Sequence, residues 1–497
     1  MNPRTSNLGQ TKSPLANIPF ELQEHIIIEF IRDPYTTFDQ LKSLRLVSRS
    51  FNDVVAPKVL SCIRLFRHGD SALPSMRQLQ ALTSSNSNNH LYMTDTLLLG
   101  NWKWIYGDKL FVSFREMRNT GLWVPGIIVN STLLPFIYFL GFLFMPHLLP
   151  LTVFNSAVRL RARHRLSHTS SLNMPNIRRV EWTAERDDPN WITSRTVKLL
   201  AEFSQLTDLV LIIDEEQDLS YIAKHLSKLR NLRKFMVDIR YWPGKLIRSR
   251  SSQINDFGKV IGANPHLTHL ELLQGYGGCG DLSKIFSYVP AERPLILEHL
   301  GISDNFSEPA AVVPHIQSLK SLDLTSYWSS RFLLVLLTRR IFPPVVKTAR
   351  VDDNFLDFLS SHPRIVSLSI HSTYEEFVGK AILEIMARHS SSLTCFSTSS
   401  LSFCRCLYKI QNEFSLLKCM RLEKLVLWFD YYVGTDVDVQ LELAMALSVI
   451  ARLQKSLTLV VTDILAFKAC IRHCGRSRNP LIRDLTGRIV YEKDGIR

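Results

Sequence analysis

One short hydrophobic pattern, apolar-x-x-apolar-x-apolar, recurs along most of the chain. Alternation of this kind places every second side chain on the same face, so each copy predicts a short strand with one buried face. The full copies are Ile177/Val180/Trp182, Leu206/Leu209/Leu211, Leu232/Phe235/Val237, Leu267/Leu270/Leu272, Leu297/Leu300/Ile302, Leu319/Leu322/Leu324, Ile365/Leu368/Ile370 and Leu422/Leu425/Leu427. Degenerate copies fall at Val346/Ala349/Val351, Leu393/Phe396 and Leu457/Val460.

The sequence between these strands predicts helices, at residues 194–203, 222–229, 253–261, 282–289, 378–388 and 440–453. A short strand and an amphipathic helix cannot bury their apolar faces alone, but stacked copies bury the faces of their neighbours. The pattern resembles irregular leucine-rich repeats, which implies an α/β solenoid with parallel strands on the concave side and helices on the convex side. A doubly wound α/β domain also alternates strand and helix and is the alternative, but repetition of one strand template favours the solenoid.

Residues 14–63 follow a different pattern, with three amphipathic runs separated by turns. Pro19 precedes the first run, where a proline is favourable because its missing N–H would have no partner in the first helical turn. The apolar positions of the three runs are Leu22, Ile26, Ile27, Phe30 and Ile31, then Phe38, Leu41, Leu44 and Leu46 or Val47, then Phe51, Val54 and Val55. Three short helices cannot bury this much apolar surface among themselves, so a permanent partner is predicted.

This segment resembles an F-box, the module that docks a SKP-type adaptor in cullin-based ubiquitin ligases. Ile18-Pro19-Phe20-Glu21-Leu22 matches the family's Leu-Pro-x-Glu-Leu opening, and residues 44–51 match its Leu-Arg-Leu-Val-Ser-Arg-x-Phe centre. Ile18 stands where Leu is usual and Phe51 where many members have Trp, and both remain large and apolar. The alternative is an ordinary helical cap on the domain that follows.

The resemblance implies a set of adaptor-binding residues, of which periodicity leaves open which face the adaptor and which face sister helices. These residues are Ile18, Pro19, Leu22, Ile26, Leu41, Leu44, Leu46, Val47 and Phe51.

Residues 121–158 contain no Asp, Glu, Lys or Arg. Their centre, 127–149, is long enough to cross a bilayer, and the arginines of 159–165 would form a positively charged flank. Prolines at 125, 135, 146 and 150 interrupt the run and argue against a membrane helix. The other two interpretations are an apolar insertion packed into the solenoid and a segment foreign to the fold, as a retained intron would be. We favour the foreign segment, because residues 109–117 continue naturally into 172–177.

Composition fits a folded intracellular protein. Of the 497 residues 46% are hydrophobic, and the eight cysteines show no disulfide-framework spacing. With no signal-peptide pattern at the N-terminus, we expect reduced thiols and a cytoplasmic or nuclear location, with membrane association through 127–149 as the alternative. The net charge of +14 would suit nucleic acid. Much of the excess lies in two patches, the arginines of 159–179 and the cations of 468–488, and neither patch has interleaved aromatic residues. A solvated basic surface is therefore favoured, and nucleic acid is not expected as a partner.

Two short motifs could carry chemistry. Residues 275–280 match G-x-G-x-x-G between a predicted strand and helix, with Asp304 near the next strand end, which is the context of a dinucleotide site. Glycines also suit a plain strand-to-helix turn, which we favour. Cys470-x-x-His473-Cys474 could join residues 404 and 406, both cysteines, in a zinc site, but no known zinc spacing matches.

No catalytic motif of the G-x-S-x-G, H-E-x-x-H or P-loop type is present. We therefore expect no catalytic residues, no cofactor and no metal, and a protein that is not an enzyme.

The expected organisation is a disordered N-terminus at 1–13, an F-box at 14–66, a linker with a first degenerate repeat at 67–118, the apolar insertion at 119–168, the solenoid at 169–475 and a basic tail at 476–497. The F-box resemblance implies a substrate-receptor subunit of an SCF-type cullin ubiquitin ligase. Its partners would be a SKP-type adaptor, through it a cullin, and a protein substrate bound by the repeats. The alternatives are an F-box scaffold that acts without ubiquitylation, and a membrane-anchored repeat protein.

Overall fold

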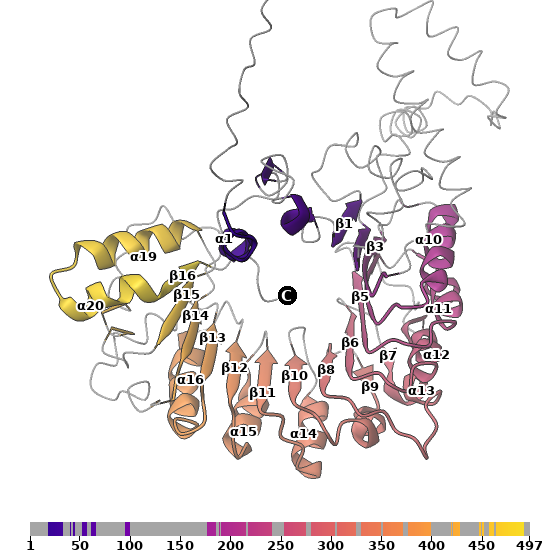
Figure 1. Cartoon of the computed structure of the whole chain (residues 1–497). Coiled ribbons are helices and arrows are strands. Elements are labelled where there is room, and N and C mark those ends of the chain that lie inside the picture. The colour runs from indigo at the N-terminus through magenta and orange to yellow at the C-terminus, as the bar shows by residue number, and fades with distance from the viewer. Residues whose placement is uncertain are drawn as a thin grey trace, which may run out of the picture. The chain divides into compact units, whose positions relative to one another are not determined.

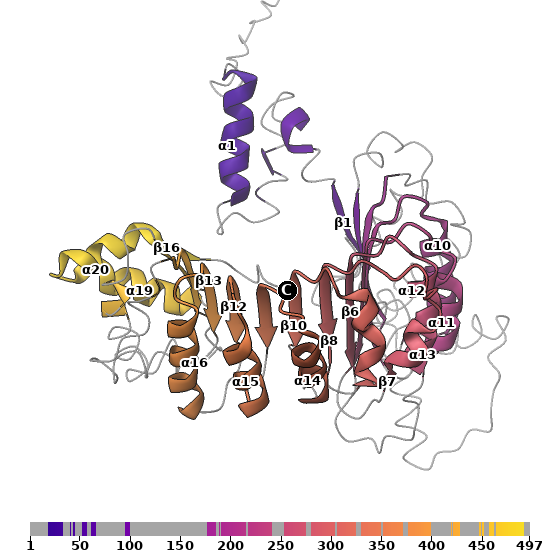
Figure 2. The same ribbon diagram turned by 90° about the horizontal axis from the view of Figure 1, so that it is seen from below.

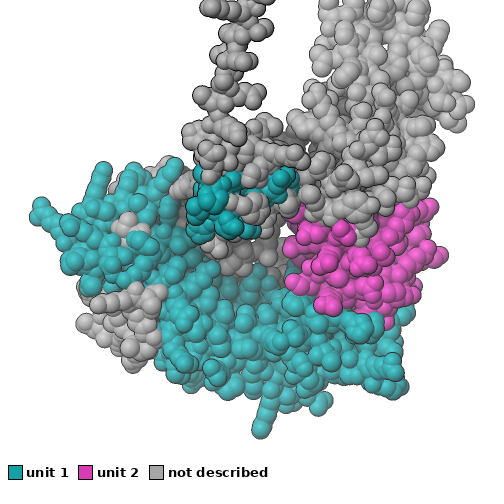
Figure 3. Space-filling view, viewed as in Figure 1, with its two compact units in different colours: residues 1–59, 245–258, 265–497 teal, residues 60–244, 259–264 magenta. Residues whose placement is uncertain are grey.

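The structure is a computed structural model of the whole chain. It describes residues 18–32, 40, 43–44, 52–56, 61–65, 95–99, 176–184, 188, 190–214, 217–240, 253–274, 280–303, 306–324, 330–348, 351–370, 376–398, 419, 421–427, 447–448, 450–451, 457–461 and 464–491. The chain divides into two compact units, one of residues 1–59, 245–258 and 265–497, and a second of residues 60–244 and 259–264 (Figure 3). We call them unit 1 and unit 2.

Unit 2 contains parallel strands that pair in chain order. They are β1 (Cys62–Leu65), β2 (Thr96–Leu99), β3 (Arg179–Ala184), β4 (Asp208–Asp214) and β5 (Lys234–Arg240). Helices α10 (Asn190–Glu202) and α11 (Leu219–Leu226) follow β3 and β4 and pack against each other. The carboxylate of Asp218 accepts a hydrogen bond from the Tyr221 amide, which begins α11 because it satisfies an N–H with no helical partner.

Unit 1 repeats the same arrangement. Its main sheet consists of β6 (His269–Gln274), β8 (His299–Ile302), β10 (Ser321–Leu324), β11 (Val345–Thr348), β12 (Ser367–Ile370), β13 (Cys395–Thr398), β14 (Lys424–Leu427), β15 (Thr458–Val461) and β16 (Ile489–Tyr491), all in parallel pairs. Helices α14 (Ser330–Arg339), α15 (Asp353–Ser361) and α16 (Glu376–Arg388) lie along one face of this sheet (Figures 1 and 2).

Further elements of unit 1 are α1 (Phe20–Arg32), η3 (Gln253–Phe257), a small parallel pair of β7 (Gly280–Asp281) and β9 (Phe306–Ser307), α13 (Leu282–Phe286), η4 (Pro309–His315), α19 (Ile464–Arg476), α20 (Pro480–Asp484) and η6 (Leu485–Arg488). Helix α12 (Gly258–Gly262) spans the boundary between the two units in the sequence. The mixed α/β architecture with parallel sheets is consistent with a leucine-rich-repeat solenoid. Each described strand of these sheets pairs with its neighbours in the series, as a stack of repeats requires.

The strand template predicts the buried face correctly. In unit 2, Val180 is in register with Leu209, and Leu209 with Phe235, and all three are buried. In unit 1, Leu322 and Leu368 are buried at the equivalent position. Each of these side chains gains about 1.5–3 kcal/mol from leaving water, so repetition of the template fixes the register of the sheet.

Two degenerate copies were predicted in the wrong register. Val346 is in register with Leu322, which makes it the second apolar position of its strand and not the first. The third position is Thr348, which is fully buried and donates a hydrogen bond from Oγ1 to the Leu324 carbonyl over 3.4 Å. In β15, Leu459 and not Val460 is in register with Leu425. A buried hydroxyl that finds a backbone acceptor can replace an apolar side chain, and the hydrophobic pattern does not reveal this.

Buried polar side chains at the turns from helix to strand join each repeat to the one before it. Asn264 donates from Nδ2 to the Leu229 carbonyl over 3.1 Å, and its Oδ1 accepts from the Leu232 amide over 2.9 Å. The Nε2 of His389 lies 2.9 Å from the Leu359 carbonyl in the same way. These bonds satisfy backbone groups that the turns leave without a partner, so a polar residue is required at a buried position.

The C-terminal segment contains regular elements. Within the range that we expected to be a basic tail, 476–497, lie α20, η6 and β16, and β16 extends the sheet beside β15. No helix among the described residues is long and apolar enough to cross a membrane. The apolar insertion, 119–168, lies outside the described residues, so its three interpretations stay open.

Candidate functional site

The first helix carries an exposed apolar stripe. Leu22 is 54% exposed and Ile26 is 41% exposed, and Pro19, just before the helix, is exposed as well. Residues four apart lie on the same side of a helix, so Leu22 and Ile26 form one surface. We call Pro19, Leu22 and Ile26 the apolar stripe of α1.

The other side of α1 is fixed by local packing. Ile27 is 1% exposed and packs in a cluster with Val54 and Val55, and Leu44 contacts this cluster. The buried side chain of Gln23 donates from Nε2 to the Ile18 carbonyl over 2.7 Å, which holds the segment before the helix in place. Residues from all three predicted helical runs therefore contribute to one small core, and residues 43–44 and 52–56 are helical.

The structure thus separates the predicted adaptor-binding residues that it describes. Pro19, Leu22 and Ile26 face away from the local core, whereas Leu44 packs against it and Ile18 is half-buried. The remaining members, Leu41, Leu46, Val47 and Phe51, lie outside the described residues. The sequence did not place Ile27 in the core, because helical spacing alone does not say which of the adjacent apolar positions Ile26 and Ile27 is inside. It also did not reveal the bond from Gln23 to the Ile18 carbonyl.

The strand face of unit 1 carries paired polar side chains between the template's apolar positions. Glu271 Oε1 lies 3.2 Å from His299 Nε2, and the ring of His269 stacks on that of His299 with centroids 5.7 Å apart. Farther along the sheet, Lys347 Nζ lies 3.0 Å from Asp323 Oδ2. Partners on adjacent strands meet because the strands are in register, which the sequence does not show until the register is known. These contacts hold polar side chains in fixed positions on the strand face.

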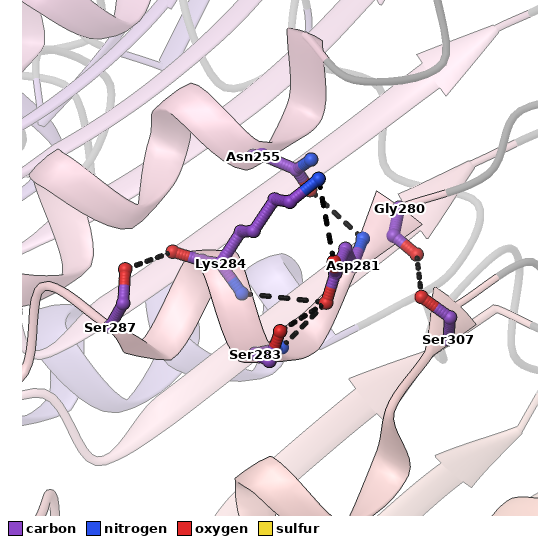
Figure 4. Close-up of polar contacts among 7 residues, drawn as sticks. All are labelled: Asn255, Gly280, Asp281, Ser283, Lys284, Ser287 and Ser307. Carbon is purple, nitrogen blue, oxygen red and sulfur yellow. Dashed lines mark hydrogen bonds and ion pairs between the residues drawn. The ribbon is translucent and has the colours of Figure 1, made fainter.

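A carboxylate already occupies the N-terminus of α13, the helix that follows the glycine-rich motif in the sequence. The carboxylate of Asp281 caps the N-terminus of α13 and accepts hydrogen bonds from the Ser283 amide at 2.9 Å and the Ser283 hydroxyl at 2.6 Å (Figure 4). Bonds from the Ser283 side chain and from the backbone amides, with the Lys284 ammonium nearby, hold the pKa of Asp281 below its usual range. A negative charge therefore occupies the place where a pyrophosphate would bind. Residues 275–279 and Asp304 lie outside the described residues.

Gly280 has a structural explanation. A Cβ at this position would collide with the ring of Phe306, on the paired strand β9, and would lie 3.0 Å from Ile254 Cγ2. The Ser307 hydroxyl donates to the Gly280 carbonyl over 3.3 Å and joins the same two strands. Close packing of β9 against β7 explains the glycine at this position.

We expect Gly280→Ala to lower the free energy of unfolding of unit 1 by about 1–3 kcal/mol, because the new methyl group overpacks the contact with Phe306. Urea denaturation measures this, and Phe306→Leu in the same chain should recover part of the loss. Gly475→Ala is the matched control, because a Cβ there meets no atom within 4 Å. An unchanged stability of Gly280→Ala would remove the packing explanation.

The cysteine motif of α19 faces the core. Cys470 and Cys474 are fully buried, and burial raises the pKa of the Cys474 thiol to about 11. A protonated, buried thiol packs as a small apolar side chain. Within the described ranges no group of three or more His, Cys, Asp or Glu side chains could hold a metal ion, and residues 404 and 406 lie outside these ranges.

No protein-family model matches the chain, and no curated protein sequence matches it. Among solved structures, the chain is similar to the leucine-rich repeat-containing protein LegL7 from Legionella pneumophila, with 12% sequence identity and a TM-score of 0.32. The match covers 65% of this chain and 93% of LegL7. The strand pairing and register described above, and not this distant likeness, define the repeat architecture.

Proposed function

We propose that this chain is a substrate-receptor subunit of an SCF-type cullin ubiquitin ligase. The apolar stripe of α1 would bind a SKP-type adaptor, and the repeat units would bind the protein substrate. The observation that carries the proposal is the position of the stripe: Pro19 and Leu22 belong to the opening that resembles an F-box, and they lie on the side of α1 that the local core leaves exposed.

The energetics of the stripe favour a docking role. Large apolar side chains on one helix side cost free energy in water. Leu22 and Ile26 are about half exposed, so each contributes about half of the roughly 1.5–3 kcal/mol of full burial when a partner covers it. The ligase subunits would supply catalysis, and this chain would raise the concentration of substrate near the ubiquitin carrier. Paired polar side chains on the strand face, Glu271 with His299 and Asp323 with Lys347, would give the substrate polar contacts that are already ordered.

The double variant Leu22→Ala/Ile26→Ala is expected to weaken binding of the purified adaptor at least about tenfold, because both apolar contacts are lost. Isothermal titration calorimetry measures the affinity, and thermal unfolding shows that the fold is kept. Leu334→Ala/Leu481→Ala removes two apolar side chains with similar exposure, 63% and 50%, from other elements and serves as the control. Equal affinity of the wild type and the Leu22→Ala/Ile26→Ala variant would contradict the docking site.

Binding of a cullin distinguishes a ligase substrate receptor from a scaffold that binds the adaptor alone. The full-length chain is mixed with adaptor and cullin, and size-exclusion chromatography shows whether the three elute together. Elution of all three as one complex supports the receptor function. A chain–adaptor complex from which the cullin is absent supports the scaffold.

A further inference from the structure

The outward side of α19 carries a row of cations. Lys468, Arg472 and Arg476 are all exposed, and they are spaced by four residues, so they form one stripe along the helix. Cys470 and Cys474, on the opposite side, are fully buried against the body of unit 1. Packing of the cysteines therefore fixes the direction in which the cations point, away from the protein.

Two more exposed cations, Arg478 and Arg483, follow the helix. Between residues 464 and 491 the sequence has one carboxylate, Asp484, and it pairs with Arg488. We call Lys468, Arg472, Arg476, Arg478 and Arg483 the basic surface. No carboxylate among the described residues lies within ion-pair distance of Lys468, Arg472, Arg476 or Arg478.

Two backbone hydrogen bonds restrict the guanidinium groups of the basic surface. Arg472 donates from Nε to the Lys468 carbonyl over 3.2 Å, and Arg483 donates from Nε to the Ser477 carbonyl over 2.5 Å. In both cases the bond uses Nε and leaves the terminal nitrogens for a ligand. A guanidinium held in this way loses less conformational freedom when it binds an anion, so recognition is favoured.

Repulsion among the cations of α19 destabilises the helix, and the helix dipole offsets this only in part. Like charges four residues apart repel one another. The negative end of the helix dipole favours Arg476, in the last turn of α19, but not Lys468, near its start. An external anion would neutralise the whole row.

We propose that the basic surface binds an acidic protein segment in extended conformation, with a carboxylate at every second residue. Cations four residues apart on a helix are separated by about 6 Å along its axis. Alternate side chains of an extended strand lie about 6.6 Å apart on one side, which nearly matches this separation. Arg guanidinium groups bind carboxylates through two parallel hydrogen bonds, so two such pairs could form along α19, at Arg472 and Arg476, while the Lys468 ammonium would pair with a third carboxylate as a point charge.

An acidic protein segment fits better than nucleic acid or a membrane surface. Sequence-independent binding of single strands uses aromatic side chains for stacking, and no exposed described residue of 464–490 is aromatic. Insertion into a lipid surface requires an apolar helix side, whereas the outward side of α19 is charged. The inference goes beyond the proposed function and does not need it, because the basic surface and the α1 stripe are separate elements.

The test uses the full-length chain and two fluorescein-labelled peptides of equal composition, one alternating Glu and Ser and one with all Glu before all Ser. Fluorescence anisotropy should show at least about fivefold tighter binding of the alternating peptide. Arg472→Glu/Arg476→Glu should weaken binding of that peptide at least about tenfold. Lys224→Glu/Lys228→Glu makes the same charge change at two exposed positions four residues apart in unit 2, and it should retain binding within about twofold.

Thermal unfolding shows whether each variant is folded. If Arg472→Glu/Arg476→Glu does not fold, Arg472→Gln/Arg476→Gln is measured in its place. Equal binding of the two peptides, or equal loss in the Lys224→Glu/Lys228→Glu control, overturns the inference. A single-stranded oligothymidine and phosphatidylserine vesicles are tested in the same way. If either binds more tightly than the alternating peptide, and the arginine variant loses this binding, the surface belongs to another partner and the inference is overturned.

Discussion

Asn264→Leu is expected to lower the free energy of unfolding of unit 2 by about 2–5 kcal/mol, although the two side chains have similar size. Asn264 is 1% exposed, and its Oδ1 accepts the hydrogen bond of the Leu232 amide. A leucine would leave this buried amide without that acceptor and would remove the bonds to the Leu229 and Val260 carbonyls. Urea denaturation gives the change in free energy, and hydrogen exchange at β4 and β5 locates it.

Asn231→Leu is the matched control for this prediction. Asn231 is exposed and makes one hydrogen bond, from Nδ2 to the Ser204 carbonyl over 3.0 Å, so water can replace its partner. Its loss should change the free energy of unfolding by about 0.5 kcal/mol or less. Similar costs at the two asparagines would show that burial and the bonds between repeats are not what makes Asn264 important.

Acidification is expected to unfold unit 1 through its buried histidines. Burial lowers the pKa of His315 to about 4 and that of His362 to about 4. The Nδ1 of His315 accepts from the Leu295 amide, and the Nδ1 of His362 accepts from the Arg364 amide. A proton on either nitrogen would turn the acceptor into a donor that faces another donor.

The direction of the pH effect follows from these lowered pKa values. An unfolded histidine takes up its proton near pH 6.5, whereas the folded one resists until about pH 4. The stabilisation is fully present above pH 6.5, and it is lost as the pH falls from there to about 4, by about 1–3 kcal/mol for each histidine. Burial also lowers the pKa of His389, whose ring contacts that of His362, so it adds to the effect in the same direction.

Urea denaturation at several values between pH 7.5 and pH 4 measures this loss. His315→Asn keeps an acceptor for the Leu295 amide but cannot be protonated, so it should reduce the pH dependence. His225→Asn is the control, because His225 is only half-buried and lies in unit 2. A pH dependence that His315→Asn leaves unchanged would exclude His315 as a source of acid sensitivity.

The hydrophobic pattern alone was sufficient for the strands of the eight full copies and for many helices. Every full copy of the template became a strand, because a side chain such as Leu270 or Leu425 gains most when its neighbours in the stack also bury it. Helices α14 and α15 were not predicted, although Phe355 and Phe358 are fully buried. The two helices flank β11, whose degenerate copy of the template was read in the wrong register.

The sequence by itself determined the repeated strand, the inward positions of each copy and the apolar excess near Pro19, because these depend on local spacing and on the free energy of burial. The tertiary structure alone decided that Leu22 and Ile26 face outward while Ile27 faces inward, and that His299 meets Glu271. Such contacts form only after packing brings surfaces together, and these surfaces consist of residues that are distant in the sequence. Neighbouring repeats likewise supply the backbone groups that require polar side chains at buried positions such as Asn264 and His362.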